Sequence, residues 1–300
     1  RRSEQLASLI EVEQQNPLMI TSCKVSEDLE KWLCRQVLQE GERLKNLMIK
    51  LWSGITWEKN HRVLVLTPSS LLWSLKPLRE VSEGAVFLAV SEDNHLRLST
   101  ELEVLAPMER PILIDSKVES IEKLEDNVEF EVIGGRIPWK AFSERNFSEL
   151  WPILTKKSTV NTELSLIISN PCSGPALSLK QSLEVYNSNQ NYDYSLLNDL
   201  IYKEQKWLNN QDQKKKFILQ LEKLGWEVFM EEWTEFVYQK VDSSIIQRWF
   251  NQGSEYREII LKNCEEEKLI GLKKLFKILD SRTIKQKIIH TKLRAKKLIN

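Results

Sequence analysis

Short apolar runs that alternate with helical stretches restrict the possible folds of this chain more than any other feature. Each run lacks the polar alternation of a strand that has one face in water. Helical stretches with apolar residues at helical spacing lie between them. This pattern predicts parallel β-strands buried on both faces by helices. The five runs are Arg62–Leu66, 85–90, 111–115, 130–133 and 163–169.

The rest of the chain extends this plan. Residues 1–58 are expected to be helical up to the turn at Ser53-Gly54, and residues 59–241 to form the α/β domain. Two closely spaced runs, 226–233 and 234–240, predict an antiparallel hairpin at the edge of the sheet. Residues 242–300 are expected to form a basic helical segment. The predicted fold class is therefore α/β, a Rossmann-like, mostly parallel sheet with an antiparallel edge hairpin and helical N- and C-terminal segments.

Composition limits the class of protein. There are 43 basic and 43 acidic residues among 300, so no global charge draws the chain to nucleic acid or to anionic membranes. No segment approaches the roughly 18 apolar residues of a membrane helix. Four cysteines lie far apart, and neither they nor the three histidines have metal-ligand spacing. We therefore expect reduced thiols, no metal site and a cytoplasmic location, and the start at Arg1 predicts a piece of a longer chain.

Parallel strands that end in an antiparallel hairpin resemble the class I S-adenosylmethionine methyltransferases. In this family, glycines after the first strand let the backbone approach the cofactor, and an acid after the second strand holds the ribose. Aligned with that pattern, the glycine positions hold Thr67, Ser69 and Leu71, and the ribose acid falls on Ala89. The resemblance implies that any remaining cofactor pocket is lined by Leu66, Thr67, Pro68, Ser69, Ser91, Glu92, Asp115, Gly134 and Gly135.

Two interpretations of this altered pattern compete. In the first, the pocket is lost and the domain is a non-catalytic scaffold without a cofactor, because Cβ atoms stand where the backbone should meet the ligand. In the second, the chain is an active methyltransferase that binds S-adenosylmethionine through a divergent loop, in which Glu92 and Asp93 replace the missing acid. No Asn-Pro-Pro-Tyr box is present, so amino-directed DNA methylation has no motif here. We favour the first interpretation and assign no catalytic residue.

A narrower resemblance rests on the order of several segments. Together they resemble the C-terminal, methyltransferase-like extension of cyanobacterial fusion proteins whose N-terminal part is a RarA-type (MgsA-type) AAA+ ATPase. That resemblance implies a role in DNA replication and repair, with the ATPase part of the same polypeptide as partner. This chain has no phosphate-binding loop of its own. The segments are Trp32-x-x-Arg35-Gln36, Trp52-x-Gly54-Ile55-x-Trp57, Arg62–Leu66, Leu71-Leu72-Trp73, Val132–Arg136 and Arg248-Trp249-Phe250.

Charge is unevenly distributed along the chain. Residues 255–300 carry 13 basic and 6 acidic side chains, so the remainder carries a net charge of −7. Clustered positive charge displaces counterions from a phosphate backbone and gives salt-dependent binding. The segment is therefore a candidate for DNA contact through Lys292, Arg294, Lys296 and Lys297. A solvated helical face and a docking surface for an acidic partner are the alternatives.

Overall fold

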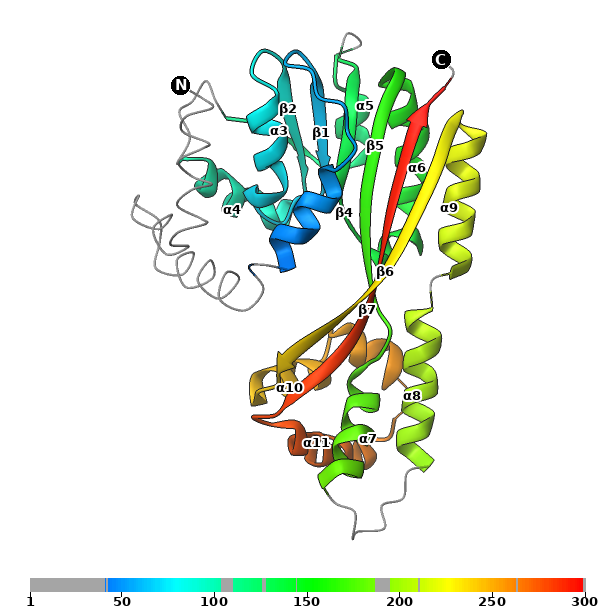
Figure 1. The fold of residues 1–300 in the computed structure, drawn as a ribbon. Coiled ribbons are helices and arrows are strands. Elements are labelled where there is room, and N and C mark those ends of the chain that lie inside the picture. Colours follow the sequence, from blue (N-terminus) through cyan, green and yellow to red (C-terminus); the bar gives the residue numbers. More distant parts are fainter. Residues whose placement is uncertain are drawn as a thin grey trace. The chain divides into compact units, whose positions relative to one another are not determined.

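A computed structural model gives the fold shown in Figure 1. It describes residues 41, 43–103, 110–125, 128–143, 145–186, 195–209, 211–262 and 264–298. The predicted helix over 1–58 is confirmed for residues 43–52, and Ser53-Gly54 ends it with Gly54 at φ 74°. Residues 55–58 are not helical, and residues 1–40 and 42 lie outside the described residues.

Seven strands form one sheet in the order β3-β2-β1-β4-β5-β7-β6 (Figure 1). β1, β2, β3 and β4 pair in parallel, as the unbroken apolar runs predict. β6 and β7 run in opposite directions at the far edge. The strands are β1 Arg62–Leu66, β2 Ala85–Val90, β3 Ile112–Asp115, β4 Phe130–Pro138, β5 Ser158–Pro171, β6 Trp226–Lys240 and β7 Thr283–Lys297.

Helices connect these strands and cover the sheet. η2 (Leu71–Ser74), α3 (Leu75–Glu80), α4 (Glu92–Leu102), α5 (Val118–Glu122), η4 (Trp139–Ser143) and α6 (Arg145–Lys156) lie between β1 and β5. α7 (Pro175–Tyr186), α8 (Ser195–Leu208) and α9 (Gln211–Lys223) separate β5 from β6. Between β6 and β7 lie α10 (Ser243–Phe250), the π-helix η5 (Tyr256–Ile260), α11 (Glu266–Phe276) and η6 (Lys277–Leu279).

The edge hairpin differs from the predicted one. Residues 226–240 form the single strand β6, and its antiparallel partner is β7 instead of a second half of the same run. Trp233-Thr234 contains none of the Gly, Asn, Asp or Pro residues that a tight turn needs, so the chain continues extended. The predicted helix over residues 242–300 is correspondingly wrong for 283–297, where Leu293, Ala295 and Lys297 alternate with the exposed Arg294 and Lys296 as in a strand.

The described residues fall into two compact units. Unit 1 takes in the residues up to Ile168, Gln213–Glu231 and the residues from Thr291 on, whereas unit 2 comprises Ser169–Asp212 and Glu232–His290. The division therefore falls within β5, β6 and β7 and differs from the domain bounds expected from sequence. Each unit has a hydrophobic core of its own.

In unit 1, both faces of the sheet are covered. One face carries a core shared by the strands with α5, α6 and α9, centred on the fully buried Trp151. On the opposite face, the ring of Trp52 from the helix over 43–52 packs so closely on Gly134 that a Cβ there would lie 2.5 Å from it. Double coverage of this kind is what the apolar runs predict.

Candidate functional site

The predicted site residues gather where parallel strands end. β1, β2, β3 and β4 finish at the same edge of the sheet in unit 1, and ligands of such sheets bind at this edge. A cavity of about 210 Å³ opens there. Its walls are mostly apolar, and three of the lining side chains, Thr67, Ser116 and Lys117, carry polar groups. The lining residues are Leu66, Thr67, Ala89, Ser116, Lys117, Ile121, Ile137, Pro138, Ala141, Phe147 and Leu150.

Thr67, the first residue after β1, has an unusual backbone conformation. Its φ is 44°, in the left-handed region that β-branched residues rarely enter. The Thr67 backbone N–H donates to the Ala89 carbonyl over 2.9 Å, and its hydroxyl donates to the Arg136 carbonyl over 3.4 Å. The loop thus keeps a glycine-like backbone at the position of the first family glycine, and neighbouring strand ends hold this strained residue in place.

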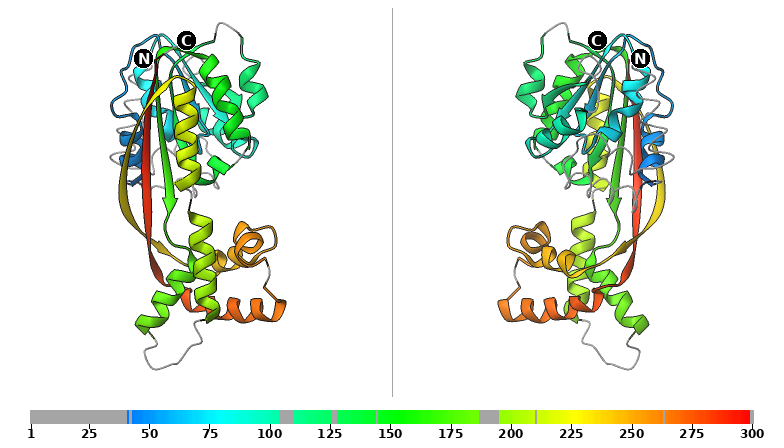
Figure 2. Two further views of the ribbon diagram at one scale, coloured as in Figure 1. Left: turned by 90° about the vertical axis from the view of Figure 1, so that its right-hand side faces the viewer. Right: turned by 90° about the vertical axis from the view of Figure 1, so that its left-hand side faces the viewer.

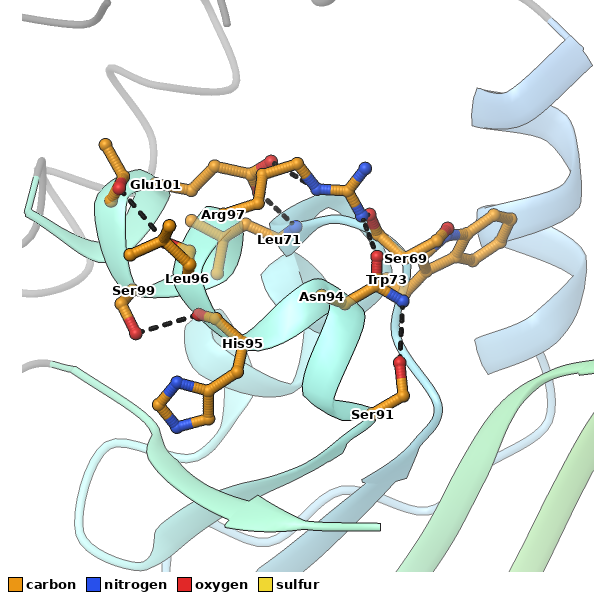
Figure 3. A network of polar contacts seen from close by, with 11 residues as sticks. Ser69, Leu71, Trp73, Ser91, Asn94, His95, Leu96, Arg97, Ser99 and Glu101 are labelled. Atoms are coloured by element: carbon orange, nitrogen blue, oxygen red, sulfur yellow. Dashed lines mark hydrogen bonds and ion pairs between the residues drawn. The ribbon is translucent and has the colours of Figure 1, made fainter.

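Side chains of α4 hold the rest of this loop (Figure 3). The Arg97 guanidinium donates to the Ser69 carbonyl and also to Asn94 Oδ1, 2.7 Å away. Glu101 Oε2 accepts from the Leu71 backbone N–H over 2.7 Å. Ser69 Oγ accepts from Trp73 Nε1 over 3.2 Å. Backbone groups that would face a cofactor in this loop therefore already have protein partners.

Glu101 is the centre of this network. Its side chain is 8% exposed, and Arg97 Nε lies 3.9 Å from its second oxygen. Burial raises the pKa of Glu101, and the Leu71 N–H and the Arg97 charge lower it by less. A buried carboxylate that bridges helix and loop fixes the loop firmly, because removing either partner would leave a buried polar group unsatisfied.

The end of β2 offers no acid to a ribose. Ala89 is buried at the position of the family's ribose acid. Ser91 Oγ accepts from Asn94 Nδ2 over 3.0 Å and belongs to the first turn of α4. The candidate substitute Glu92 is 90% exposed and lies 3.9 Å from Lys117 Nζ. It is not among the described residues that line the cavity.

Asp115, at the end of β3, also turns to protein groups. Its Oδ1 accepts from the Lys117 backbone N–H over 3.0 Å, and its Oδ2 lies 3.3 Å from Lys117 Nζ. The same carboxylate raises the pKa of Lys117. The structure therefore brings Glu92 and Asp115 together around one exposed lysine, as an ion-pair cluster at the rim of the cavity.

Gly134 and Gly135 have packing roles. A Cβ on Gly135 would lie 2.5 Å from the Leu66 carbonyl oxygen, and one on Gly134 would enter the Trp52 ring. Both residues are in register with β1, where Val65 pairs with Gly134 and Leu66 with Gly135. Close approach of strand to strand and of helix to sheet accounts for both glycines.

S-adenosylmethionine does not fit this arrangement. Arg97 and Glu101 hold the Ser69 carbonyl and the Leu71 N–H of the loop, and no carboxylate is among the described residues that line the cavity. The cavity, at about 210 Å³, is also smaller than the roughly 300–1,000 Å³ of typical ligand sites. We therefore derive no reaction step through this cofactor.

The four basic candidates for DNA contact lie on β7. The Lys292 ammonium donates to the carbonyl and hydroxyl oxygens of Ser53, at 2.8 and 2.7 Å, and the Lys297 ammonium donates to the Thr155 and Ser158 carbonyls, both at 2.7 Å. Both side chains are 4% exposed, and burial lowers the pKa of each ammonium group. They stabilise the C-terminal ends of two helices. Arg294 and Lys296 are exposed, and Arg294 donates to the Gly54 carbonyl.

Unit 2 contains a hydrogen-bonded row of side chains, Ser169, His290 and Glu235, that was not predicted from the sequence and is called the His290 ladder below. Ser169 on β5 lies 2.9 Å from His290 Nδ1, and Glu235 on β6 lies 2.8 Å from His290 Nε2. Trp233 stacks on the imidazole with ring centroids 5.1 Å apart. The histidine is 0% exposed, so the ladder is closed to a substrate and serves as a structural network. The sequence signal for β7 was the two-residue alternation of side chains along 283–297, and the many lysines in this segment concealed it.

Neither a metal cluster nor a membrane helix is found in the described part of the chain. Among the residues whose positions are described, no group of three or more His, Cys, Asp or Glu side chains could hold a metal ion. Within the same ranges, no helix is both long and apolar enough to cross a membrane.

Comparisons with known proteins return fold likeness. No protein-family model matches the chain, and no curated protein matches it. Among solved structures, a candidate methyltransferase from Bacillus halodurans shares 12% identity at a TM-score of 0.48 and covers 86% of this chain and 100% of its own. A SAM-dependent methyltransferase from Archaeoglobus fulgidus shares 14% identity at 0.41, over 87% and 98%. Phosphoethanolamine N-methyltransferase 2 of Haemonchus contortus, in complex with S-adenosyl-L-methionine, shares 12% identity at 0.42, over 86% and 53%.

The fold itself follows from the sheet, in which the parallel strands are followed by an antiparallel edge hairpin of β6 and β7 with helices on both faces. The chain has the Rossmann-like fold of class I methyltransferases.

Proposed function

We propose that this chain is a non-catalytic, methyltransferase-like interaction domain. One observation carries the proposal: backbone groups of the loop after β1 already form hydrogen bonds with side chains of α4. The Arg97 guanidinium donates to the Ser69 carbonyl, and the Glu101 carboxylate accepts from the Leu71 N–H. A cofactor could use these groups only by displacing the Arg97 guanidinium or the buried Glu101 carboxylate, and a buried polar group left without its partner costs about 1–3 kcal/mol. The buried Ala89 supports the same conclusion, because it gives a ribose hydroxyl no acceptor side chain.

Calorimetric titration with S-adenosylhomocysteine tests this proposal. We expect no saturable heat up to millimolar ligand. The hydrogen-bonded loop, the absence of an acid at the end of β2 and the small cavity volume all disfavour the ligand. A methyltransferase of known affinity in the same buffer serves as the positive control. Saturation in the micromolar range would contradict the proposal and would favour the alternative, an active methyltransferase with a divergent cofactor loop.

A second part of the proposal concerns the partner. The segment order that resembles the fusion proteins supports attachment to a RarA-type AAA+ ATPase involved in replication and recombination. Co-purification of this chain with such an ATPase, supplied as a separate polypeptide, measures that association. We expect a complex that survives gel filtration. Separate elution at concentrations of tens of micromolar would oppose this part alone and leave the loss of cofactor binding untouched.

A further inference from the structure

One face of unit 2 exposes two aromatic rings side by side. Phe236 and Tyr238 on β6 are 52% and 66% exposed. They are two residues apart on one strand, so both rings lie on the same face. Lys285 Nζ on β7 lies 4.1 Å from the centroid of the Phe236 ring and 6.0 Å from that of Tyr238. This cation–π contact lies at the surface and is not needed for the packing of the hydrophobic core.

Three lysines share this face with the two rings, and the exposed Glu232 lies on it four residues before Phe236 on β6. Lys285 contacts both rings, so the odd-numbered residues around it on β7 share the face with the even-numbered residues of β6. In segments 234–240 and 283–287, which the structure describes throughout, the charged residues of this face are Lys240, Lys285 and Lys287, all exposed. The residues between them on β6, among them Glu235, are half-buried and face the His290 ladder.

Coverage of the strands is one-sided. Figure 2 shows the helices of unit 2 gathered on one side of the lower part of the β6–β7 ribbon. Their buried residues form the core of this unit, to which the two exposed rings do not belong. Phe236 and Tyr238 therefore do not serve the packing of unit 2, although exposing large apolar rings is unfavourable.

We propose that this aromatic–lysine face, defined by Phe236, Tyr238, Lys240, Lys285 and Lys287, binds single-stranded nucleic acid. Exposed rings give bases a stacking surface that does not depend on sequence, and adjacent ammonium groups neutralise the backbone phosphates. The three lysines supply charge complementarity. The carboxylates of an acidic peptide would pair with the lysines but would not stack on the rings, whereas a nucleotide supplies a base and a phosphate together, so the pair of aromatic residues favours nucleic acid.

The aromatic–lysine face differs from the DNA contact expected from sequence, although both draw on the basic segment 255–300. Lys292 and Lys297 direct their ammonium groups to backbone carbonyls inside the fold. Lys285 and Lys287 come from the same basic segment, but their side chains are exposed.

Fluorescence anisotropy with a labelled 20-nucleotide oligothymidylate tests the proposal on the whole 300-residue chain. We expect binding at low salt, with a logarithmic salt slope of roughly −2 for three neutralised phosphates. The double variant Phe236→Ala/Tyr238→Ala should bind at least about 25-fold more weakly, because each of the two lost base stacks weakens binding by about fivefold or more. Phe236→Trp/Tyr238→Trp should restore the affinity. Lys285→Glu/Lys287→Glu should abolish binding above about 100 mM salt.

Matched variants separate this face from general charge. Lys273→Glu/Lys274→Glu makes the same change of charge on the exposed side of α11 in the same unit. It should bind as the unsubstituted chain does. All variants should stay folded at the assay temperature, as circular dichroism can check, because every changed side chain is exposed. Absence of oligothymidylate binding would overturn the proposal. Equal losses for the two lysine pairs, no effect of the aromatic substitutions, or competition by polyglutamate as strong as by oligothymidylate would also overturn it.

Discussion

Replacing Glu204 with glutamine is expected to change the pH dependence of stability by roughly 3 kcal/mol. Glu204 lies on α8 in unit 2 and is 1% exposed. Its Oε1 accepts from the Tyr256 hydroxyl at 2.6 Å and from the Ala176 backbone N–H at 2.8 Å. Its Oε2 has no hydrogen-bond partner among the described residues. Burial, outweighing these hydrogen bonds, raises the pKa of Glu204 from 4.5 to about 7.

The sign follows from proton binding. Between pH 4.5 and about 7 the folded chain holds a proton on Glu204 that the unfolded chain releases. Stability contributed by the neutral carboxyl is therefore complete below pH 4.5 and is lost as the pH rises through 7. A shift from 4.5 to about 7 corresponds to roughly 3 kcal/mol of unfolding free energy. Burial also raises the pKa of Glu101, so the unsubstituted chain loses further stability over the rising pH range.

Urea unfolding at pH 4 and pH 8, followed by circular dichroism, measures the effect. The glutamine side chain cannot ionise, so the difference in unfolding free energy between variant and unsubstituted chain should move by roughly 3 kcal/mol in favour of the variant from pH 4 to pH 8. Any cost of burying an unpaired amide is the same at both pH values and cancels. Glu267→Gln on the exposed side of α11 is the control and should show no such shift. If the difference in unfolding free energy between Glu204→Gln and the unsubstituted chain is the same at pH 4 and pH 8, the pKa of the carboxyl does not change on folding.

Trp151→Ala is expected to lower the free energy of unfolding by about 3–5 kcal/mol. Trp151 on α6 is fully buried in unit 1. Its ring lies 5.4 Å from that of Phe147 and 5.0 Å from that of Phe217 on α9, centroid to centroid. The substitution leaves a large cavity where α6, α9 and the sheet share one core.

Trp151→Phe is the matched variant. The indole Nε1 is buried without a hydrogen-bond partner in the described part of the chain, so phenylalanine removes an unsatisfied donor while keeping a ring against Phe147 and Phe217. We expect its loss, measured by urea unfolding at pH 7, to be less than half of that for alanine. Similar losses for both variants would indicate that the indole's size, and not aromatic packing, dominates this site.

The central sheet was predictable because its signal is local. Runs such as Arg62–Leu66 and 85–90 contain no polar alternation, and burial on both faces is the only way to remove such strands from water. The edge was not predictable in the same way. Whether 283–297 forms a helix or a strand depends on β5 and β6 as neighbours, and lysines whose ammonium groups reach buried carbonyls look from sequence like a solvated face.

For the candidate site as well, one part could be predicted from local sequence and another part only from tertiary packing. Local sequence establishes which side chains stand where the methyltransferase resemblance expects glycines and an acid, namely Thr67, Ser69 and Ala89, and no folding can add a side chain that is absent. The groups that bind this loop come from α4, about 30 residues along the chain, and only the packing of α4 against η2 brings Glu101 to the Leu71 N–H. Hydrogen bonds between distant segments leave no periodicity in a sequence, because each partner alone is an ordinary polar residue on a helix or in a loop.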